Sequence, residues 1–574
     1  MPSTRVKAVK LPASFSRPSV DRMLRTLLLS TLLLGASLLA QAAPQQPAIA
    51  TAHPAATAAA QQMLDAGGNA FDAAVAASAA LAVVEPYGSG LGGGGFFLLR
   101  TAGDTPGYDF LDARERAPLE AKPNLYVRDG KVQRELSLNG ALAAAIPGLP
   151  AALVELAEKH GRLPLKTSLA PAIRLANEGF AVDRVYRERA TWRLAALRDD
   201  AESAKLFLDQ GEIPAEGHML RQPDLATTLR ALAEHGRAGF YTGPVAERLV
   251  TGVRHAGGIW TLDDLREYRI ARREPLRFAL EDGRELISAP PPSAGGIALA
   301  QSLAMLQQLP WREAEPVQRV HYVVEALRRA YRDRGLLGDP DFVKNPVEQL
   351  LSPGHLAVLA GSIDPERATP SASLPPAGTW HEGDHTTHFA VLDTEGNAVA
   401  ATLSINLPFG AAFTVPGTGV LLNDEMDDFA ADVQGANAYG LTGSQANAIA
   451  GGKRPLSSMS PSFIESSDEF TAFGTPGGSR IPSMVLLSML EYLDDQPIAR
   501  WPAVARYHHQ FLPDVIEHEP DTFSDEQIAE LQRRGHELKR LDRQYGNQQV
   551  LFWDKVSGEV KAASDPRGIG TATP

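Results

Sequence analysis

"GDHTTHFAVLDTEGNAVAATLSIN", residues 383–406, contains the pattern on which the fold depends. Apolar residues recur at every second position on both sides of "TEGN", which is typical of two strands joined by a hairpin turn. Pairing Leu392 with Ala398 sets a register that puts Ser404 opposite Thr386. A slip of one residue would move these side chains to opposite faces. The stretch therefore predicts a hairpin with two hydroxyl side chains facing each other at its open end.

Thr386 has two interpretations. Threonine is common in strands because its β-branched side chain suits a pleated sheet, and this is the ordinary explanation. Strand formation does not require "HTTH", however. Cleavage of the chain before Thr386 would give that residue an α-amino group with a pKa of about 7.7–8, which can act as a general base for its own hydroxyl. The second interpretation is therefore an N-terminal threonine nucleophile, with Asn406 on the same strand face as Ser404.

The composition changes just before this hairpin. Residues 361–385 are rich in Pro, Ser and Gly and contain few apolar residues, so we expect an exposed, mobile connector. Residues 141–354, upstream, show the 3–4 spacing of amphipathic helices. A mobile stretch that ends at a strand is a good place for the chain to be cut. We expect a large fragment of residues 43–385 and a small fragment of residues 386–574.

The Gly-rich stretch "YGSGLGGGGFFLLR", residues 87–100, formally contains G-x-G-x-x-G. It follows two Ala-rich helical patterns in residues 54–84, which Gly67-Gly68 separates as a helix stop, and it leads into a strand. A dinucleotide site requires the reverse order, a strand followed by the loop and a helix. Nucleotide binding is therefore not favoured.

Charge and cysteine content restrict the class of protein. The 574-residue chain has a formal net charge of −13 and no cysteine, which argues against nucleic-acid binding and excludes disulfides, thiolate metal sites and a cysteine nucleophile. Residues 23–42 have the basic start, apolar run and A-x-A end of a secretory signal; an uncleaved anchor is the alternative. Residues 1–42 carry six Lys/Arg and one Asp, so the remaining chain has a charge of −18. An exported protein without cysteine suits a bacterial periplasm.

Other candidate groups each have an ordinary explanation. His385 and His388 point to opposite faces of a strand, so we expect no metal site there. Gly477 and Gly478 could present two unobstructed N–H groups to an oxyanion, or form a tight turn. Paired serines in "KRPLSSMSPS" (453–462) are common turn-formers, and the acidic "NDEMDDF" segment is usually a solvated turn.

As a set, in this order, these motifs closely resemble the γ-glutamyltranspeptidase family, and the resemblance covers essentially the whole chain after residue 42. It rests on the following blocks: "GGNAFDAAVAASAALAVVEP" (67–86), "GLGGGGFFLLR" (90–100), "TTHFAVLDTEGNAVAAT" (386–402), "GVLLNDEMDDF" (419–429), "KRPLSSMSPS" (453–462), "GTPGGSRI" (474–481) and "ASDPR" (563–567). The resemblance implies an α+β fold, the αββα sandwich of N-terminal-nucleophile hydrolases. It also implies a precursor that cuts itself into a large and a small subunit, which stay together as a heterodimer.

Catalytic roles follow from the resemblance. Thr386 matches the nucleophile, exposed by cleavage after His385. Ser404 matches a position usually held by threonine that orients the nucleophile, and it keeps the hydroxyl. Gly477 and Gly478 match the oxyanion hole.

Substrate-binding roles follow in the same way. Asn406, Glu425 and Asp428 match the pocket for the α-amino group of the γ-glutamyl moiety, where some bacterial members have Gln in place of Glu425. Arg114, Ser457 and Ser458 match the pocket for the α-carboxylate. Tyr439 matches the lid residue that closes over the site. Because a γ-glutamyl group ends in a zwitterion, we expect an anionic and a cationic patch held apart, with the arginine fork binding both carboxylate oxygens.

The sequence thus predicts a periplasmic enzyme that needs no cofactor and transfers the γ-glutamyl group of glutathione and related compounds to water or to an amino acid or peptide. Two alternatives remain. One is a cephalosporin or glutaryl acylase on the same scaffold, and the other is a non-catalytic secreted binding protein that retains the fold.

Overall fold

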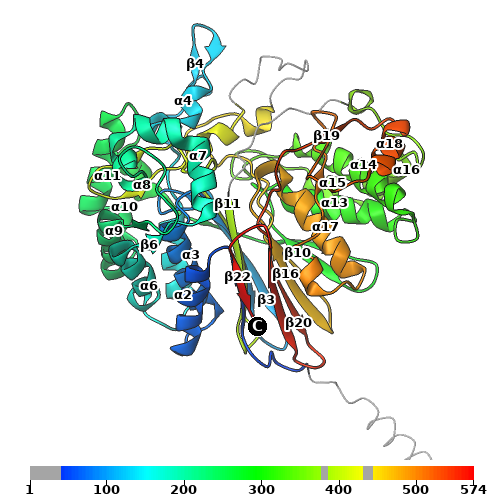
Figure 1. Ribbon diagram of the computed structural model, residues 1–574, viewed down its shortest axis with the longest axis horizontal. Helices are drawn as coiled ribbons and strands as arrows, with labels where there is room; N and C mark the ends of the chain where they lie inside the picture. Colours follow the sequence, from blue (N-terminus) through cyan, green and yellow to red (C-terminus); the bar gives the residue numbers. More distant parts are fainter. Residues whose placement is uncertain (1–40, 376–385, 431–443) are drawn as a thin grey trace, which may run out of the picture.

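Two stacked antiparallel sheets form the centre of the molecule (Figure 1). The computed structural model describes residues 41–375, 386–430 and 444–574. In order across the first sheet, the strands are β22 (Thr571–Thr573), β1 (Ala48–Thr51), β11 (Thr386–Leu392), β12 (Ala398–Ser404), β2 (Gly94–Thr101), β3 (Gly107–Ala113) and β8 (Ala271–Arg273). Those of the second sheet are β21 (Val560–Ser564), β20 (Gln549–Asp554), β16 (Glu469–Gly474), β15 (Ser462–Glu465), β10 (Glu285–Ser288) and β9 (Leu276–Ala279).

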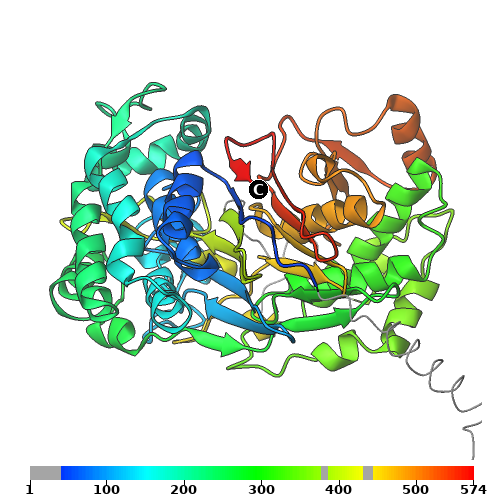
Figure 2. The same ribbon diagram turned by 90° about the horizontal axis from the view of Figure 1, so that it is seen from below.

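Helices cover the outer face of each sheet, and Figure 2 shows the two groups on opposite sides of the strands. Helices in the core on the first sheet are α2 (Pro54–Asp65), α3 (Ala70–Val84), α5 (Leu149–Lys159), α6 (Leu165–Glu178), α7 (Arg184–Asp199), α8 (Ala201–Phe207), α9 (Pro223–His235), α10 (Ala238–Tyr241), α11 (Gly243–His255) and α12 (Leu262–Glu267). Helices in the core on the second sheet are α13 (Gly295–Gln307), α14 (Pro316–Arg334), α15 (Val347–Leu350), α16 (Pro353–Gly361) and α17 (Ile481–Leu493). The order of layers is helix, sheet, sheet, helix, so the predicted αββα sandwich is confirmed.

Smaller elements lie outside the two main sheets and the helices named above. They are α4 (Glu135–Leu138), α18 (Asp525–Arg533), the strand pairs β4 (Val127–Arg128) with β5 (Lys131–Val132), β6 (Phe180–Ala181) with β7 (Met219–Leu220) and β13 (Thr414–Val415) with β14 (Val420–Leu421), and the three-stranded sheet β17 (Tyr507–His508), β18 (Ile516–His518) and β19 (Leu538–Arg540).

The two-residue period of the strands divides their side chains between the two cores. On β11, Phe389 and Val391 lie in the core beneath the N-terminal helices, whereas Ala390 and Leu392 face the core shared with the second sheet. All four are fully buried. Because both faces of β11 are covered, the strand that begins at Thr386 is held in the middle of the molecule.

The predicted hairpin is confirmed, including its register. Leu392 pairs with Ala398, and Thr386 pairs with Ser404 at the open end. The sheets approach closely behind this end: a Cβ atom on Gly474 would lie 2.1 Å from the ring of His388. Glycine at this position therefore lets β16 of the second sheet pack against the strand that carries Thr386.

The Ala-rich segment forms two helices, α2 and α3, as predicted. Gly67, with φ of 84°, ends the first helical segment, and Asn69 and Asp72 form a capping box that starts α3. Every side chain of α3 is buried. Small alanine side chains let this helix lie close against the first sheet.

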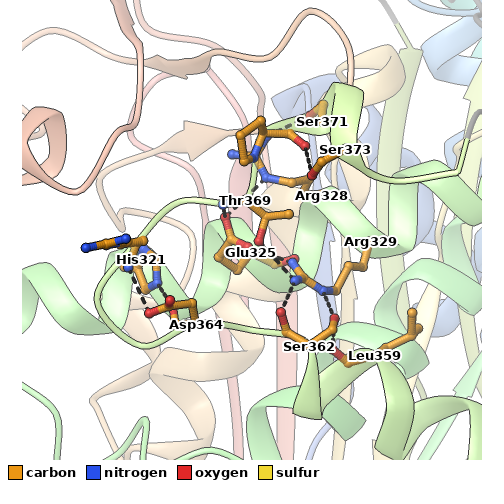
Figure 3. Close-up of polar contacts among 12 residues, drawn as sticks. His321, Glu325, Arg328, Arg329, Leu359, Ser362, Asp364, Thr369, Ser371 and Ser373 are labelled. Atoms are coloured by element: carbon orange, nitrogen blue, oxygen red, sulfur yellow. Dashed lines mark hydrogen bonds and ion pairs between the residues drawn. The ribbon is translucent and has the colours of Figure 1, made fainter.

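Residues 361–375 of the predicted connector make side-chain hydrogen bonds to α14 (Figure 3). The Arg329 guanidinium donates to the hydroxyls of Ser362 (2.8 Å) and Thr369 (3.1 Å). Arg328 donates to the Ser371 hydroxyl at 2.7 Å. Most side chains of this segment are exposed, as expected. Several polar side chains of this segment therefore bind buried arginines of α14, and its mobility stays a prediction.

Asp514 extends this anchor to the chain beyond Thr386. Its carboxylate accepts a hydrogen bond from the Ser371 backbone N–H at 2.7 Å and pairs with Arg328. The segment before the predicted cleavage point is therefore tied to residues of the predicted small fragment. Residues 376–385, the rest of the connector, lie outside the described residues.

The predicted signal also lies outside the described residues, apart from its last two positions, Gln41 and Ala42. Within the described ranges, no helix combines the length and apolar character needed to cross a bilayer. The secretory signal therefore remains a prediction.

Candidate active site

Thr386 is the first residue of β11, at the end of the hairpin. Its hydroxyl oxygen is buried and has no hydrogen-bond partner among the described residues. Thr386 lines a pocket together with Gly477. A buried hydroxyl without a partner costs free energy, so such groups are concentrated where function requires them. This threonine has the position and the exposure to a pocket that a nucleophile needs.

Ser404 and Asn406 form a tight corner opposite Thr386. The backbone N–H of Asn406 donates to the Ser404 hydroxyl at 2.8 Å. Asn406 adopts a left-handed φ of 73°, a conformation that asparagine tolerates better than most residues. Its side-chain amide donates to the backbone oxygen of Asp424 at 3.0 Å. The corner thereby joins the end of β12 to the acidic segment that carries Glu425.

Arg114 brings the predicted recognition residues together. Nη1 donates to Glu425 Oε2 at 2.7 Å, and Nη2 donates to a carboxylate oxygen of Asp428. All three side chains are almost fully buried. The cationic and anionic groups are thus in direct contact, whereas the sequence suggested two patches held apart. Burial is the reason, because a guanidinium and carboxylates without solvent must neutralise one another.

Glu115 is a fourth member of this cluster, and sequence reasoning missed it. It is fully buried, it lies 3.6 Å from Arg114, and both carboxylate oxygens have no hydrogen-bond partner among the described residues. Burial raises the pKa of Glu115 to about 8 against the lowering effect of Arg114. Burial likewise raises the pKa of Glu425 to about 8, against the effects of Arg114 and of a hydrogen bond from Ser404.

The cluster therefore contains more carboxyl groups than cationic groups. One guanidinium, Arg114, faces the carboxyl groups of Glu115, Glu425 and Asp428. Like charges disfavour ionisation of neighbouring carboxyls, and an added cation would favour it. This arrangement can accept the ammonium group of a ligand while the arginine binds a ligand carboxylate.

Arg114 contacts the backbone that directly precedes Ser457 and Ser458. Arg114 Nε donates to the Pro455 carbonyl oxygen at 3.3 Å, and its Nη2 donates to that of Leu456 at 3.4 Å. The Ser457 hydroxyl accepts from the Met459 N–H at 3.1 Å. Both serines are buried rather than in a solvated turn. Arg114 thus contacts the backbone just before the two serines, whereas the Ser458 hydroxyl accepts from Arg334 Nε at 3.3 Å.

Gly477 and Gly478 form a buried turn between β16 and α17. Their φ values are 140° and 55°, both in the region that favours glycine. A Cβ atom on Gly477 would lie 2.4 Å from the Met484 methyl group. Gly477 lines the same pocket as Thr386, and Gly478 follows it directly. The turn interpretation and the oxyanion interpretation are compatible, because this turn lies at the nucleophile.

Glu85 and Tyr87 also line the Thr386 pocket and were not identified from the sequence. The Thr387 hydroxyl donates to Glu85 Oε2 at 2.6 Å, and the Tyr87 hydroxyl donates to Glu85 Oε1 at 3.1 Å. Burial raises the pKa of Glu85. The available signal was a glutamate directly after the Ala-rich, fully buried α3, where a charged residue is expected to have a partner.

Two predicted site residues, His385 and Tyr439, lie outside the described residues. Among the residues that are described, no group of three or more His, Cys, Asp or Glu side chains is arranged to hold a metal ion. His388 instead bonds to the Thr402 hydroxyl at 2.9 Å, and burial lowers the pKa of His388 to about 3.

Two stacked antiparallel sheets between helical layers, with a threonine at the start of a central strand, define an N-terminal-nucleophile hydrolase. The comparisons with known proteins give the family. The chain belongs to the gamma-glutamyltranspeptidase family, whose characteristic pattern matches residues 56–574.

Similar proteins include a glutathione hydrolase proenzyme of Pseudomonas sp. (strain A14), 41% identical over 79% of this chain and 80% of that protein. The glutathione hydrolase proenzyme of Escherichia coli (strain K12) is 36% identical over 92% of each chain. Among solved structures, a cephalosporin acylase from Bacillus halodurans aligns over 99% of both chains with a TM-score of 0.81 and 26% identity. Helicobacter pylori gamma-glutamyltranspeptidase aligns over 56% of this chain and 93% of that one, with a TM-score of 0.54 and 36% identity.

Proposed function

We propose that this protein is a self-processing γ-glutamyltransferase and glutathione hydrolase. The observation that carries the proposal is the Thr386 hydroxyl, buried without a hydrogen-bond partner among the described residues at the start of a central strand. Family membership and the glutathione hydrolase names of relatives across the chain support the same activity. The buried cluster around Arg114 supports recognition of a zwitterionic glutamyl end.

Self-cleavage comes first in this scheme. Thr386 Oγ attacks the carbonyl carbon of residue 385, the peptide C–N bond breaks, and the proton moves to the departing nitrogen. Water then hydrolyses the resulting ester, which restores the hydroxyl and leaves a carboxylate on the large subunit. The product is a heterodimer of residues 43–385 and 386–574 in which Thr386 carries an α-amino group.

The new amine serves as the base during turnover. With an ordinary pKa of about 7.7–8, it can take the hydroxyl proton near neutral pH. Thr386 Oγ attacks the γ-amide carbon, and Gly477 and Gly478 N–H groups stabilise the oxyanion. The C–N bond breaks, the amine returns its proton to the leaving nitrogen, and water or an amino acid or peptide resolves the γ-glutamyl ester. Ser404 orients the nucleophile.

Recognition uses the buried charge cluster. The substrate α-carboxylate binds Arg114 and the hydroxyls of Ser457 and Ser458, and Tyr439 closes over it. The α-ammonium binds the acidic side chains of Glu425 and Asp428 together with the neutral side chain of Asn406. Charge-assisted hydrogen bonds of about 1.5–3 kcal/mol each replace the internal ion pairs of the ligand-free cluster.

The site of action in this proposal is the periplasm. The signal-like residues 23–42 and the absence of cysteine support export from a bacterial cell.

Gel electrophoresis under denaturing conditions tests the proposal. We expect two fragments, and the smaller one should begin Thr-Thr-His on N-terminal sequencing. Thr386→Ala should remain one inactive chain, because it lacks the attacking oxygen. A wild-type protein that stays one chain would support the non-catalytic alternative, and a fragment that starts elsewhere would refute the nucleophile.

Rates with γ-glutamyl and glutaryl anilides separate the proposal from an acylase. The acidic cluster favours a ligand with an α-ammonium group, so the γ-glutamyl substrate should react faster. A preference for glutaryl would support the acylase alternative.

A further inference from the structure

The open end of β11 has a strand partner on one side only, among the residues that the structure describes. On the β12 side, Thr386 pairs with Ser404. On the β1 side, the ladder ends at the pair of Thr51 with Phe389, before it reaches residues 386–388. The start of β11 therefore has fewer ladder contacts than the rest of the strand, and contacts from outside the sheet matter more there.

The loop between α3 and β2, residues 85–93, packs against this end of the strand. A Cβ atom on Gly88 would lie 3.3 Å from the Thr386 carbonyl oxygen and 3.5 Å from Thr387 Cβ. Glycine at position 88 leaves room for the loop to lie directly on the strand. The loop is therefore in contact with the peptide that joins Thr386 to the next residue.

Glu85 binds the strand end from this loop. Its Oε2 accepts a hydrogen bond from the Thr387 hydroxyl at 2.6 Å, and its Oε1 accepts one from the Tyr87 hydroxyl at 3.1 Å. The backbone of Glu85 is fixed in turn: its N–H donates to the Leu81 carbonyl oxygen at 2.8 Å, and its own carbonyl oxygen accepts from the Gly88 N–H at 2.8 Å. Glu85 is 3% exposed, so its carboxyl group cannot turn toward solvent.

Local preferences disfavour a glutamate at this position. Glu85 is the C-cap of α3, where the helix dipole repels a negative charge, and burial removes the water that would solvate the carboxyl group. The hydroxyls of Thr387 and Tyr87 offset part of this cost by donating to it. Residues that break local rules in this way are expected chiefly at functional sites. The contact between Glu85 and the strand of the nucleophile therefore calls for a functional explanation.

We propose that Glu85 is a positioning residue for the nucleophile: by holding the Thr387 hydroxyl, it fixes the peptide that joins Thr386 to Thr387. The inference rests on the proposed function, because it takes Thr386 as the attacking residue. Cleavage removes the chain before Thr386, which is then held by its pairing with Ser404 and by its bond to Thr387. A tilt of that peptide would misalign the amine and the hydroxyl with a substrate bound at the oxyanion turn.

Thr387→Val tests the inference, because valine keeps the β-branched shape and removes the hydroxyl. We expect kcat for a γ-glutamyl anilide, per small fragment seen on a denaturing gel, to fall by roughly 10- to 100-fold, the cost of a small misplacement of reacting groups. KM should stay within about threefold of wild type, since acylation and deacylation use the same two groups of Thr386. Thr387→Ser restores the donor and should return kcat to within about threefold of wild type.

The acceptor has its own pair of variants. Glu85→Gln keeps an oxygen that can accept from Thr387, so it should retain kcat within about threefold of wild type. Glu85→Met has a similar length without an acceptor and should show the loss seen in Thr387→Val. The double variant Glu85→Met/Thr387→Val should lose no more than either single variant, because both remove the same hydrogen bond.

Thr228→Val is the matched control. The Thr228 hydroxyl is buried like that of Thr387 and donates to the Thr418 carbonyl oxygen at 2.7 Å. It belongs to α9 and does not line the Thr386 pocket. Thr228→Val should lower Tm about as much as Thr387→Val, because each loses one buried hydrogen bond, and it should leave kcat unchanged. A merely stabilising Thr387 would behave in the same way as this control.

Three results would overturn the inference: a kcat of Thr387→Val within about threefold of wild type, an equal fall in Thr387→Val and Thr387→Ser, or an equal fall in Glu85→Gln and Glu85→Met. The last two would mean that side-chain shape or charge, rather than the hydrogen bond, determines the rate.

Self-cleavage gives a second measurement, because it uses the same hydroxyl of Thr386. A folded Thr387→Val precursor that stays uncut supports the inference if Thr387→Ser and Thr228→Val cut themselves normally, and it overturns the inference if either of them also stays uncut. Failure of the proposed function looks different, since the wild type itself would then remain one chain and release nothing from the anilide.

Discussion

Replacing Arg114 with lysine tests how the γ-glutamyl end is recognised. Lysine keeps the positive charge that the buried carboxyls of Glu115, Glu425 and Asp428 require, so the precursor should fold and cut itself. It loses the planar fork, which can bind two oxygens of one carboxylate together. The variant therefore separates charge from geometry.

The contacts of Arg114 give the magnitude. Its guanidinium reaches Glu425 at 2.7 Å, Asp428, and the carbonyl oxygens of Pro455 and Leu456 at 3.3 and 3.4 Å. One ammonium cannot reach all of these groups, so at least one charge-assisted bond to a bound carboxylate is lost. Such a bond contributes about 1.5–3 kcal/mol, which corresponds to a rise in KM of roughly 10- to 150-fold. The kcat should change by less than about threefold, since the reacting atoms are elsewhere.

Three anilides provide the assay. The γ-glutamyl and glutaryl substrates carry the carboxylate that Arg114 binds, so their KM values should rise in Arg114→Lys. The 4-aminobutyryl substrate lacks that carboxylate, and its KM should stay within about twofold of the parent. Arg116→Lys is the control: Arg116 lies two residues away and donates to the Gly452 carbonyl at 2.8 Å. It should leave all three values unchanged.

An unchanged KM for the γ-glutamyl anilide in Arg114→Lys would refute the carboxylate assignment. An equal rise for the 4-aminobutyryl anilide would do so as well, because it would indicate a general distortion of the pocket.

Two further predictions concern the oxyanion turn and the buried acids. Gly478→Ala, at a φ of 55°, should lower kcat by roughly 10²–10³ with a smaller effect on KM, measured on processed enzyme; a kcat within about threefold of the parent would return this turn to a purely structural role. The pKa values of Glu115 and Glu425, about 8 in the folded chain, lie above their ordinary value of 4.5, so the folded state holds more protons and its stability should fall as pH rises from about 4.5 to 8. Thermal unfolding of the single-chain Thr386→Ala protein should show this decline in Tm, and adding Glu115→Gln should flatten it; an identical slope in both proteins would contradict the assigned burial.

Much of the site could be predicted because its parts carry local signals. The hairpin register followed from alternating apolar residues and a turn, and it placed Ser404 opposite Thr386 correctly. Glu115 carried no such signal. A glutamate in "DARERAP" resembles any surface charge, and only the fold buries its carboxyl, against Gly94 of β2 and beside Arg114. The hydrogen bonds of segment 361–375 were not predicted for a related reason, since polar residues that avoid a core can still bind buried arginines.

The sequence by itself determined the alternation of the strands, the helix stop at Gly67-Gly68, and the family to which the motifs belong. These features depend on near neighbours in the chain, so local patterns record them. The tertiary structure alone brought Arg114 into contact with Glu425 and Asp428, and the Thr387 hydroxyl into contact with Glu85. These partners are separated by more than three hundred residues. Only the packing of two sheets and their helical layers sets the distance between such groups, and with it the hydrogen bonds that form the site.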